Sequence, residues 1–216
     1  MDVGAPDHIV IVVDDDSHLR EALYELLTSL GFNCATFGSA AEYSAFVKPA
    51  LPACLVLDVE LPDINGLDLQ QQIAGRDHPP VIFITGRPDV RTSVRALKAG
   101  AIDFLTKPFT EQELLAAVRV ALEQDRRTRR ERSELADLWQ RFSLLTPRER
   151  EVLPLVASGL LNKQAAAQLG ISETTLQIHR GKIMKKMQAK SLAALVRMAG
   201  SLQLPLDSIY RASEPI

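Results

Sequence analysis

The chain has 216 residues, of which 46% are hydrophobic and 24% charged, and its formal net charge at pH 7 is −2. A chain of this length forms one large domain or two ordinary ones, and its hydrophobic content excludes an intrinsically disordered protein. No apolar run approaches the roughly 20 residues that span a bilayer. The N-terminus also lacks the basic region and long apolar stretch of a signal peptide. We therefore expect a cytoplasmic protein with no membrane partner.

The charged residues are distributed unevenly along the chain. Residues 1–124 contain 9 Lys and Arg against 18 Asp and Glu, whereas residues 125–216 contain 16 against 9. An acidic part followed by a basic part suggests two domains, of which the basic one faces a polyanion. The only two cysteines, Cys34 and Cys54, lie in apolar segments. They predict a reduced, buried pair rather than a disulfide framework.

Short apolar runs alternate with amphipathic segments up to about residue 124. The run at 9–13 predicts a strand, and residues 17–29 have the apolar periodicity of a helix. Five strands alternating with five helices predict an α/β domain with a doubly wound, five-stranded parallel sheet. The further strands are expected near 33–37, 53–57, 81–84 and 102–106, and the further helices near 39–47, 65–75, 89–99 and 110–124.

Polar residues stand where four of the predicted strands end. Asp14 and Asp15 follow the first strand, Asp58 ends the third, Thr85 follows the fourth apolar run, and Lys107 follows the fifth. Because the carboxyl ends of parallel strands share one edge, where open α/β sheets bind ligands, these side chains should converge. Each of them alone is more often structural, as a helix cap or a turn residue. Their convergence is what predicts a functional site.

The predicted site has the chemistry of phosphoryl transfer. Carboxylates held together bind a divalent cation such as Mg²⁺, and a main-chain carbonyl near Glu60 could add a ligand. Asp58 would then accept the phosphoryl group. Lys107 would balance its charge, and the Thr85 hydroxyl would bond one of its oxygens.

Residues 9–122 resemble the receiver domain of two-component response regulators. The resemblance is carried by the motifs VVDDD (12–16), LVLDVELPDINGLDL (55–69), FITG (83–86) and KAGAIDFLTKPF (98–109). It implies a flavodoxin-like sheet of strand order 2-1-3-4-5. Sheets of this order also bind their ligands at the carboxyl ends of the strands. The phosphodonor would be a phosphohistidine on a sensor histidine kinase.

The resemblance also implies roles for individual residues. Asp58 would be the phospho-acceptor, and Asp14 and Asp15 the magnesium-binding acid pair. Thr85 and Lys107 would be the signalling pair, with Phe104 at the aromatic switch position. In this family the positions of Glu60 and Arg87, two residues after Asp58 and Thr85, are associated with tuning the lifetime of the phosphoryl group.

The segment EQDRRTRRERSE, residues 123–134, contains no apolar residue. It cannot bury an apolar face, yet Arg, Glu and Gln are good helix formers. We therefore expect a solvated helical linker over residues 123–142 that continues the fifth helix. The alternative is that its arginines contact DNA phosphates.

The basic part begins with a helix start signal and continues as short helices. Thr146, Pro147 and Glu149 suit the N-cap, the first helical position and the capping box. Pro154 predicts a kink or irregular geometry because proline removes a helical hydrogen bond. Helices are expected near 148–158, 162–169, 173–187 and 191–200.

The segment NKQAAAQLGISETTLQIHRGKIMKKM, residues 162–187, has helix-turn-helix form. The periodicity of its second helix predicts a polar outer face suited to the DNA major groove. An ordinary amphipathic helix with a solvated basic face is the alternative. The residues assigned to the outer face are Thr174, Thr175, Gln177, Arg180, Gly181, Lys182, Lys185 and Lys186.

Residues 143–200 resemble the LuxR/FixJ-type DNA-binding domain. The resemblance implies an all-α, four-helix helix-turn-helix domain that binds double-stranded DNA as a dimer, with the last helix at the dimer contact. It places Gln177, Ile178 and Gly181 at recognition positions and Thr174, Thr175, Arg180 and Lys185 near the DNA backbone. Gln177 and Gly181 stand where several relatives carry basic side chains, so the chain is expected to read a different sequence with fewer direct contacts.

Together these features predict a response regulator rather than an enzyme. The expected domains are a receiver at 1–122, a linker at 123–142 and a DNA-binding domain at 143–216. Phosphorylation of Asp58 would promote homodimerisation and sequence-specific DNA binding, with RNA polymerase as a further partner. Two alternatives stay open. One is an aspartate-nucleophile phosphatase, which typically carries a second Asp where this chain has Glu60; the other is an interaction-only switch that no longer binds DNA.

Overall fold

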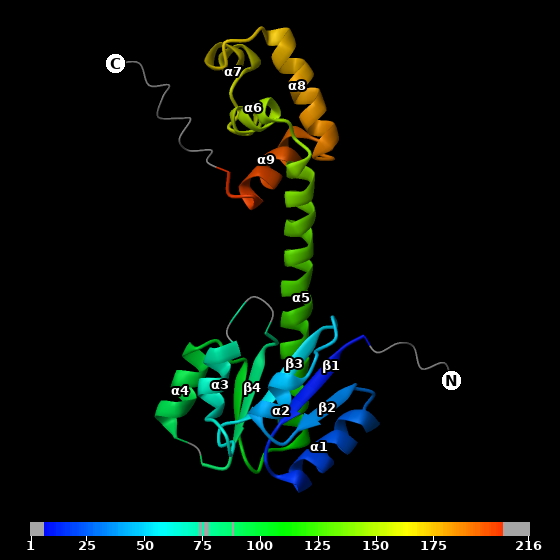
Figure 1. The fold of residues 1–216 in the computed structure, drawn as a ribbon, viewed down its shortest axis with the longest axis vertical. Coiled ribbons are helices and arrows are strands. Elements are labelled where there is room, and N and C mark those ends of the chain that lie inside the picture. The colour runs from blue at the N-terminus through cyan, green and yellow to red at the C-terminus, as the bar shows by residue number, and fades with distance from the viewer. Residues whose placement is uncertain (1–6, 74, 76–77, 88, 205–216) are drawn as a thin grey trace, which may run out of the picture. The chain divides into compact units, whose positions relative to one another are not determined.

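The computed structural model describes residues 7–73, 75, 78–87 and 89–204 (Figure 1). The chain divides into two compact units, Met1–Arg129 and Arg130–Ile216. This division falls inside the expected linker, while the expected domain limits at 122 and 143 stay a prediction. Among the described residues, no helix is both long and apolar enough to cross a membrane.

The first unit contains one parallel sheet. Its strand order is β2-β1-β3-β4-β5, which confirms the order expected from the receiver-like motifs. All residues of β1, β3 and β4 are buried, as expected for parallel strands covered on both faces. The strands are β1 Ile9–Val13, β2 Cys34–Phe37, β3 Ala53–Asp58, β4 Val81–Thr85 and β5 Asp103–Thr106.

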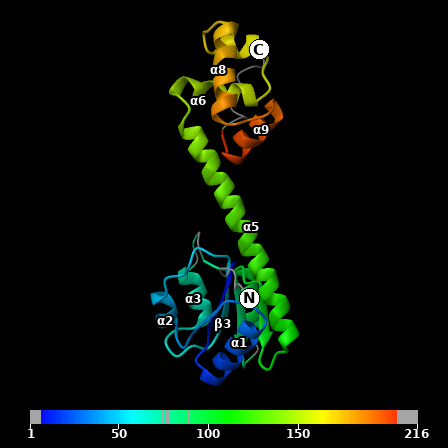
Figure 2. The same cartoon turned by 90° about the vertical axis from the view of Figure 1, so that its right-hand side faces the viewer.

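Helices cover both faces of this sheet, as Figure 2 shows. Side chains of α1 and α5 pack with Val10 and Val12 on one face. Side chains of α2, α3 and α4 pack with the alternate residues of β1 on the other face. The helices are α1 Ser17–Ser29, α2 Ala40–Ala45, α3 Gly66–Ile73, α4 Val90–Lys98 and α5 Glu111–Ser143.

Helix α5 continues to Ser143, which confirms that the charged segment after residue 123 is helical. The prediction that this segment is wholly solvated is wrong at Asp125, which is buried. Asp125 Oδ2 accepts hydrogen bonds from the main-chain N–H of Ala53 at 2.8 Å and from Arg129 Nε at 2.7 Å. A carboxylate can be buried when its hydrogen-bonding capacity is met in this way. Residues 131–137 are exposed, as expected.

The two cysteines are free, and both are paired in register with Val10 of β1. Cys54 is buried and Cys34 partly buried. Burial raises the pKa of the Cys34 thiol to about 12 and raises that of Cys54 as well. Both therefore stay protonated, inert thiols at neutral pH.

The second unit is helical, with α6 Pro147–Ala157, α7 Asn162–Gln168, α8 Glu173–Lys186 and α9 Leu192–Ser201. The predicted capping box at the start of α6 is present. Helix α6 continues through Pro154, and the kink expected there stays a prediction. Leu138 and Phe142 of α5 pack on the same core as α6, α8 and α9, so the end of α5 is part of this unit.

Candidate functional site

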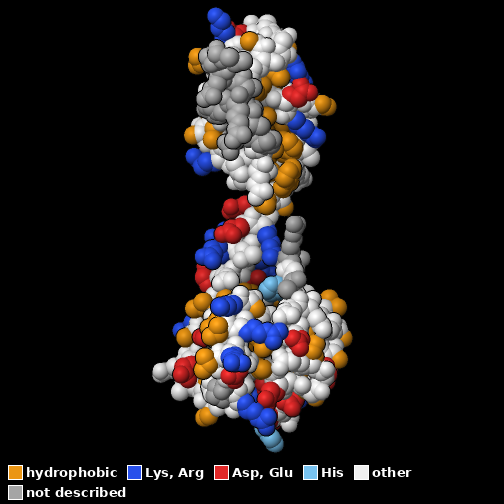
Figure 3. All heavy atoms as spheres, turned by 90° about the vertical axis from the view of Figure 1, so that its left-hand side faces the viewer, with side chains coloured by type: hydrophobic (Ala, Val, Ile, Leu, Met, Phe, Trp, Pro, Cys, Tyr) orange, Lys and Arg blue, Asp and Glu red, His pale blue; other side chains and the backbone are white. Residues whose placement is uncertain are grey.

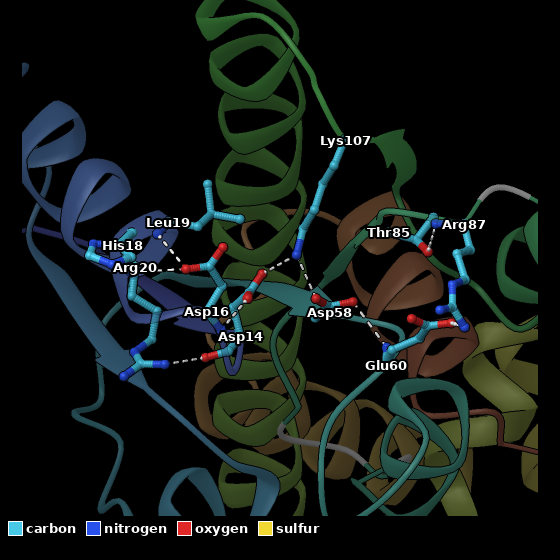
Figure 4. A network of polar contacts seen from close by, with 10 residues as sticks. All are labelled: Asp14, Asp16, His18, Leu19, Arg20, Asp58, Glu60, Thr85, Arg87 and Lys107. Atoms are coloured by element: carbon cyan, nitrogen blue, oxygen red, sulfur yellow. Dashed lines mark hydrogen bonds and ion pairs between the residues drawn. The ribbon is translucent and has the colours of Figure 1, made fainter.

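The carboxyl ends of the strands bring four polar side chains together (Figure 4). Asp14 follows β1, Asp58 ends β3, Thr85 ends β4 and Lys107 follows β5. Asp14, Asp58 and Thr85 are almost completely buried, at 0%, 4% and 1% exposure. The convergence that the strand ends predicted is therefore present in the fold.

Lys107 joins the two buried carboxylates. Its Nζ lies 2.6 Å from Asp14 Oδ2 and 2.5 Å from Asp58 Oδ2. The other oxygen of each carboxylate accepts a main-chain hydrogen bond at 2.9 Å, Asp14 from Asp16 and Asp58 from Glu60. Both carboxylates are thus fixed in place before any ligand arrives.

The electrostatics of this group leave an excess of negative charge. Burial raises the pKa of Asp14, although the hydrogen bond from Lys107 opposes that shift. Burial lowers the pKa of Lys107, but its hydrogen bonds to Asp14 and Asp58 outweigh this and raise it overall. One ammonium faces two buried carboxylates and the exposed Asp15, and this number of acidic groups favours an additional cation.

The same acidic groups form a candidate metal site. Carboxylate oxygens of Asp14, Asp15 and Asp58 all lie within 4.8 Å of one another. An all-oxygen donor set fits a hard divalent cation. The main-chain N–H of Glu60 is engaged with Asp58, and the predicted role of its carbonyl as a ligand stays a prediction.

Thr85 lies near Glu60 and Arg87, the two positions associated with phosphoryl lifetime (Figure 4). Thr85 Oγ1 accepts a hydrogen bond from the main-chain N–H of Arg87 at 3.1 Å. The Arg87 and Glu60 side chains point toward each other, with Nη1 and Oε1 3.7 Å apart (Figure 4). Both side chains are more than half exposed, so this ion pair contributes little stability.

Phe104 lies on β5, partly buried among the residues that pack against α2, α3 and α4. Its ring centroid is 6.2 Å from that of Phe83 on β4. Its predicted role as an aromatic switch therefore depends on packing alone, since it has no hydroxyl group.

Three residues that hold the main chain in or near the site were not predicted. Arg20 Nη1 donates a hydrogen bond to the main-chain oxygen of Asp14 at 2.7 Å. Gly66 packs so closely that an added Cβ would lie 2.2 Å from the main-chain oxygen of Asp58. Asp63 accepts hydrogen bonds from the main-chain N–H groups of Ala40 and Ala41 at the start of α2. The sequence signalled Gly66 only through its Asn65-Gly66 turn pair, and it gave no signal for Arg20.

In the second unit, α8 carries the predicted DNA-binding residues. Thr175 and Arg180 are half-buried, and Arg180 Nη1 donates to Asn162 Oδ1 on α7 at 3.0 Å. Ile178 is 54% exposed although it is apolar. The exposed members of the set are Thr174, Gln177, Ile178, Gly181, Lys182 and Lys185.

The assignment of Lys186 to the outer face is wrong. Its Nζ lies 2.6 Å from Oε2 of Glu149, a buried residue of α6. Lys186 immediately precedes the buried Met187 and follows the buried Ile183 by three residues, so it lies at the border of the packed face. In the sequence, Lys186 is one of three lysines close together, and nothing there indicates that it differs in exposure from Lys182 and Lys185.

Two family descriptions match the chain. Residues 10–119 match the response regulator receiver domain, and residues 143–199 match the bacterial regulatory proteins of the luxR family. The chain is a two-component response regulator. It pairs a receiver domain with a LuxR-type helix-turn-helix DNA-binding domain and belongs to the transcriptional regulators of that family.

Similar proteins and structures cover nearly its whole length. It is 50% identical over 195 residues to nodulation protein W of Bradyrhizobium diazoefficiens, spanning 90% of this chain and 86% of that protein. It is 41% identical to the transcriptional regulatory protein FixJ of Azorhizobium caulinodans, spanning 88% of this chain and 90% of that protein. The structure of the response regulator StyR superposes with a TM-score of 0.79 at 44% identity, over 90% of this chain and 98% of StyR. The structure of full-length FixJ from B. japonicum superposes with a TM-score of 0.54 at 34% identity, over 93% of this chain and 99% of that FixJ.

Proposed function

We propose that a sensor histidine kinase phosphorylates Asp58 of this response regulator in a Mg²⁺-dependent reaction. Phosphorylation then promotes homodimerisation and sequence-specific binding to double-stranded DNA, through which the protein regulates transcription in the cytoplasm together with RNA polymerase. The receiver would comprise residues 1–122, the linker 123–142 and the DNA-binding domain 143–216. The observation that carries this proposal is the pairing of Lys107 with both buried carboxylates, Asp14 and Asp58.

The charged groups around Asp58 support its proposed role as the acceptor. Asp14, Asp15 and Asp58 would hold the Mg²⁺ with the main-chain carbonyl of Glu60, and the ion would supply the positive charge that lets a carboxylate approach a phosphoryl donor. A bond forms between Asp58 and phosphorus as the bond from phosphorus to the kinase histidine nitrogen breaks. Lys107 then moves its ammonium from the Asp58 carboxylate to an oxygen of the phosphoryl group. The product is regulatory, so the protein is a signalling switch and not a turnover enzyme.

The switch begins at Thr85. Its oxygen already accepts from the N–H of Arg87, and its own hydroxyl hydrogen can donate to the new phosphoryl group. This movement would draw β4 and its following loop toward Asp58, and Phe104 would repack against Phe83. The proposed result is a shift in the population of two receiver conformations.

The face that changes lies around residues 89–118. Helix α4 exposes Val90 at 78%, Val94 at 45% and Leu97 at 48%. Figure 3 views the unit from the side of α4 and shows hydrophobic side chains interspersed with Lys and Arg. An apolar surface of this kind favours pairing with a second receiver, which would bring two DNA-binding domains to adjacent half-sites.

The DNA interface is proposed for the accessible face of α8. Lys182 and Lys185 would contact phosphates, with Thr174, Thr175 and Arg180 near the backbone. Gln177, Ile178 and Gly181 would face the bases. Helix α9 would form the contact between two DNA-binding domains.

Selection from random duplex DNA tests this function. The protein would be incubated with the pool with and without Mg²⁺ and beryllofluoride, which mimics phospho-Asp58. We expect a two-fold symmetric site to be enriched mainly in the activated sample. Equal enrichment in both samples would contradict the switch, and no enrichment in either would favour an interaction-only protein.

A further inference from the structure

One buried ion pair connects α8 to α6. Glu149, in the first turn of α6, is 2% exposed, and its Oε2 lies 2.6 Å from Nζ of Lys186, the last residue of α8. The same oxygen accepts the main-chain N–H of Thr146 at 2.8 Å, while Thr146 Oγ1 accepts the N–H of Glu149 at 3.3 Å. A single carboxylate therefore both caps α6 and holds the end of α8.

The lysines of α8 fall into two groups. Lys182 and Lys185 are exposed, and among the described residues neither side chain has a hydrogen bond or an ion pair. Lys186 is half-buried, and its ammonium points to Glu149. A lysine already neutralised by a buried carboxylate would have to leave that carboxylate unpaired in order to contact a phosphate, which is unfavourable.

We infer that Glu149 and Lys186 are positioning residues for DNA recognition, and that Lys186 makes no phosphate contact. The other polar contacts of α8 lie at its start and middle, where Ser172 caps the helix and Arg180 bonds to Asn162. Near its end, Ile183 and Met187 are buried in the core. The Glu149–Lys186 pair adds a polar contact to α6 at that end and so restricts how α8 can tilt on its apolar contacts. Because α8 is 14 residues and therefore about 21 Å long, a tilt released at that end would displace the residues that face the bases. The inference rests on the DNA binding proposed above.

The salt dependence of DNA binding separates positioning from phosphate contact. The probe is a short duplex carrying the site recovered by the selection, titrated with the beryllofluoride-activated full chain. Lys185→Gln, the matched control on the neighbouring residue, should lower the slope of log K against log salt by about one, as the loss of one phosphate contact does. Lys186→Gln should weaken binding by about tenfold at every salt concentration and leave the slope unchanged.

A double-variant cycle tests whether the two residues act as one unit. Glu149 does not lie on the accessible face of α8, yet Glu149→Gln should weaken binding about as much as Lys186→Gln. The double variant should be no weaker than Lys186→Gln alone, because the pair is already broken. Fluorescence of Trp139, the single tryptophan of the chain, identifies any variant whose second unit has unfolded.

A footprint of the wild-type protein needs no substitution. Lysine acetylation, read by mass spectrometry, should modify Lys182 and Lys185 in the free protein and spare them in the complex. Lys186 should be protected to the same extent in both. Protection of Lys186 only when DNA is bound, or a slope lowered by Lys186→Gln as much as by Lys185→Gln, would overturn the inference. So would a folded Lys186→Gln with wild-type affinity. Failure of the wild-type chain to bind the duplex would instead overturn the proposed function.

Discussion

Close backbone packing beneath Asp58 depends on Gly66. An added Cβ at this position would lie 2.2 Å from the main-chain oxygen of Asp58 and 3.2 Å from Val59 Cα. Backbone atoms cannot move aside as the end of a flexible side chain can. The main chain that carries Asp58, the proposed acceptor, is therefore packed against a residue with no functional group of its own.

Gly66→Ala should slow the phosphorylation of Asp58 and destabilise the first unit by about 1–3 kcal/mol, the usual cost of overpacking. Phosphoryl incorporation from a small-molecule donor and urea unfolding followed by circular dichroism measure the two effects. Gly86→Ala is the control, because a Cβ there would meet nothing within 4 Å. Wild-type phosphorylation of Gly66→Ala would show that the loop adjusts freely.

Gly181 presents the opposite case, since a Cβ added there also meets nothing within 4 Å. Glycine inside a helix is about 1 kcal/mol less favourable than alanine, so Gly181→Ala should raise the unfolding temperature of the second unit. If DNA approaches α8 at this position, the same substitution should weaken operator binding. Thermal unfolding measures the change in stability, and titration with the operator duplex measures the change in affinity. A stabilised variant with unchanged affinity would show that Gly181 does not contact DNA.

Glu149 should make the second unit sensitive to acid. Burial raises the pKa of its carboxyl, but the hydrogen bonds from Lys186 and Thr146 outweigh burial and hold the pKa below the ordinary 4.5. A group with a lowered pKa in the folded state contributes stability that is present above its ordinary pKa and is lost as the pH falls through the folded value. Urea unfolding followed by Trp139 fluorescence should show this loss in the wild type and a weaker pH dependence in Glu149→Gln. Parallel curves for both proteins would contradict the assignment.

At the scale of helices and strands, local pattern was a sufficient guide. Continuous apolar runs identified β1, β3 and β4 because both faces of a central parallel strand are buried. Cap residues set the ends of α1, α6 and α8 to within a residue or two. Local pattern could not predict contacts that join distant parts of the chain. Arg20 with Asp14, Asp125 with Ala53 and Lys186 with Glu149 all depend on how finished elements pack, and a charged side chain in sequence carries no mark of its partner.

Asp125 is the clearest of these cases, because it lies in a segment whose composition indicates solvent exposure. Its carboxylate meets the N–H of Ala53, the first residue of β3, and so attaches α5 to the end of β3 opposite Asp58. Glu123 and Gln124 at the start of the polar run are exposed, whereas this contact buries Asp125, so composition alone does not locate the buried residues of α5.

Asp125→Ala should destabilise the first unit by about 1–3 kcal/mol, because it leaves a buried N–H without an acceptor. Asp125→Asn, which retains an acceptor oxygen, should cost less. Glu123→Ala is the control on an exposed residue of the same helix and should fall within about 0.5 kcal/mol of the wild type. Hydrogen exchange at the Ala53 amide gives a local readout, and continued protection in Asp125→Ala would show that another group accepts this hydrogen bond.

At the scale of the whole molecule, charge restricts how activation can work. The net charge of residues 1–124 is negative and repels DNA, whereas that of residues 125–216 is positive and attracts it. Phosphorylation adds further negative charge, so it cannot increase DNA affinity by direct attraction. An increase must come from geometry, and pairing two chains is sufficient, because the second DNA-binding domain then binds at a high effective concentration.

The pairing of two chains should depend on the apolar face of α4. Val94→Asp places a charge between Val90 and Leu97, which are exposed at 78% and 48%. It should abolish the dimer that beryllofluoride induces, as measured by sedimentation, and leave phosphorylation of Asp58 unchanged because Val94 is not part of the site. Operator affinity of the activated protein should then fall to that of the unactivated one. Val47→Asp is the control, since Val47 is 89% exposed but lies outside residues 89–118. A Val94→Asp protein that still dimerises would move the interface to another face, whereas one that stays monomeric and binds DNA normally would separate dimerisation from DNA binding.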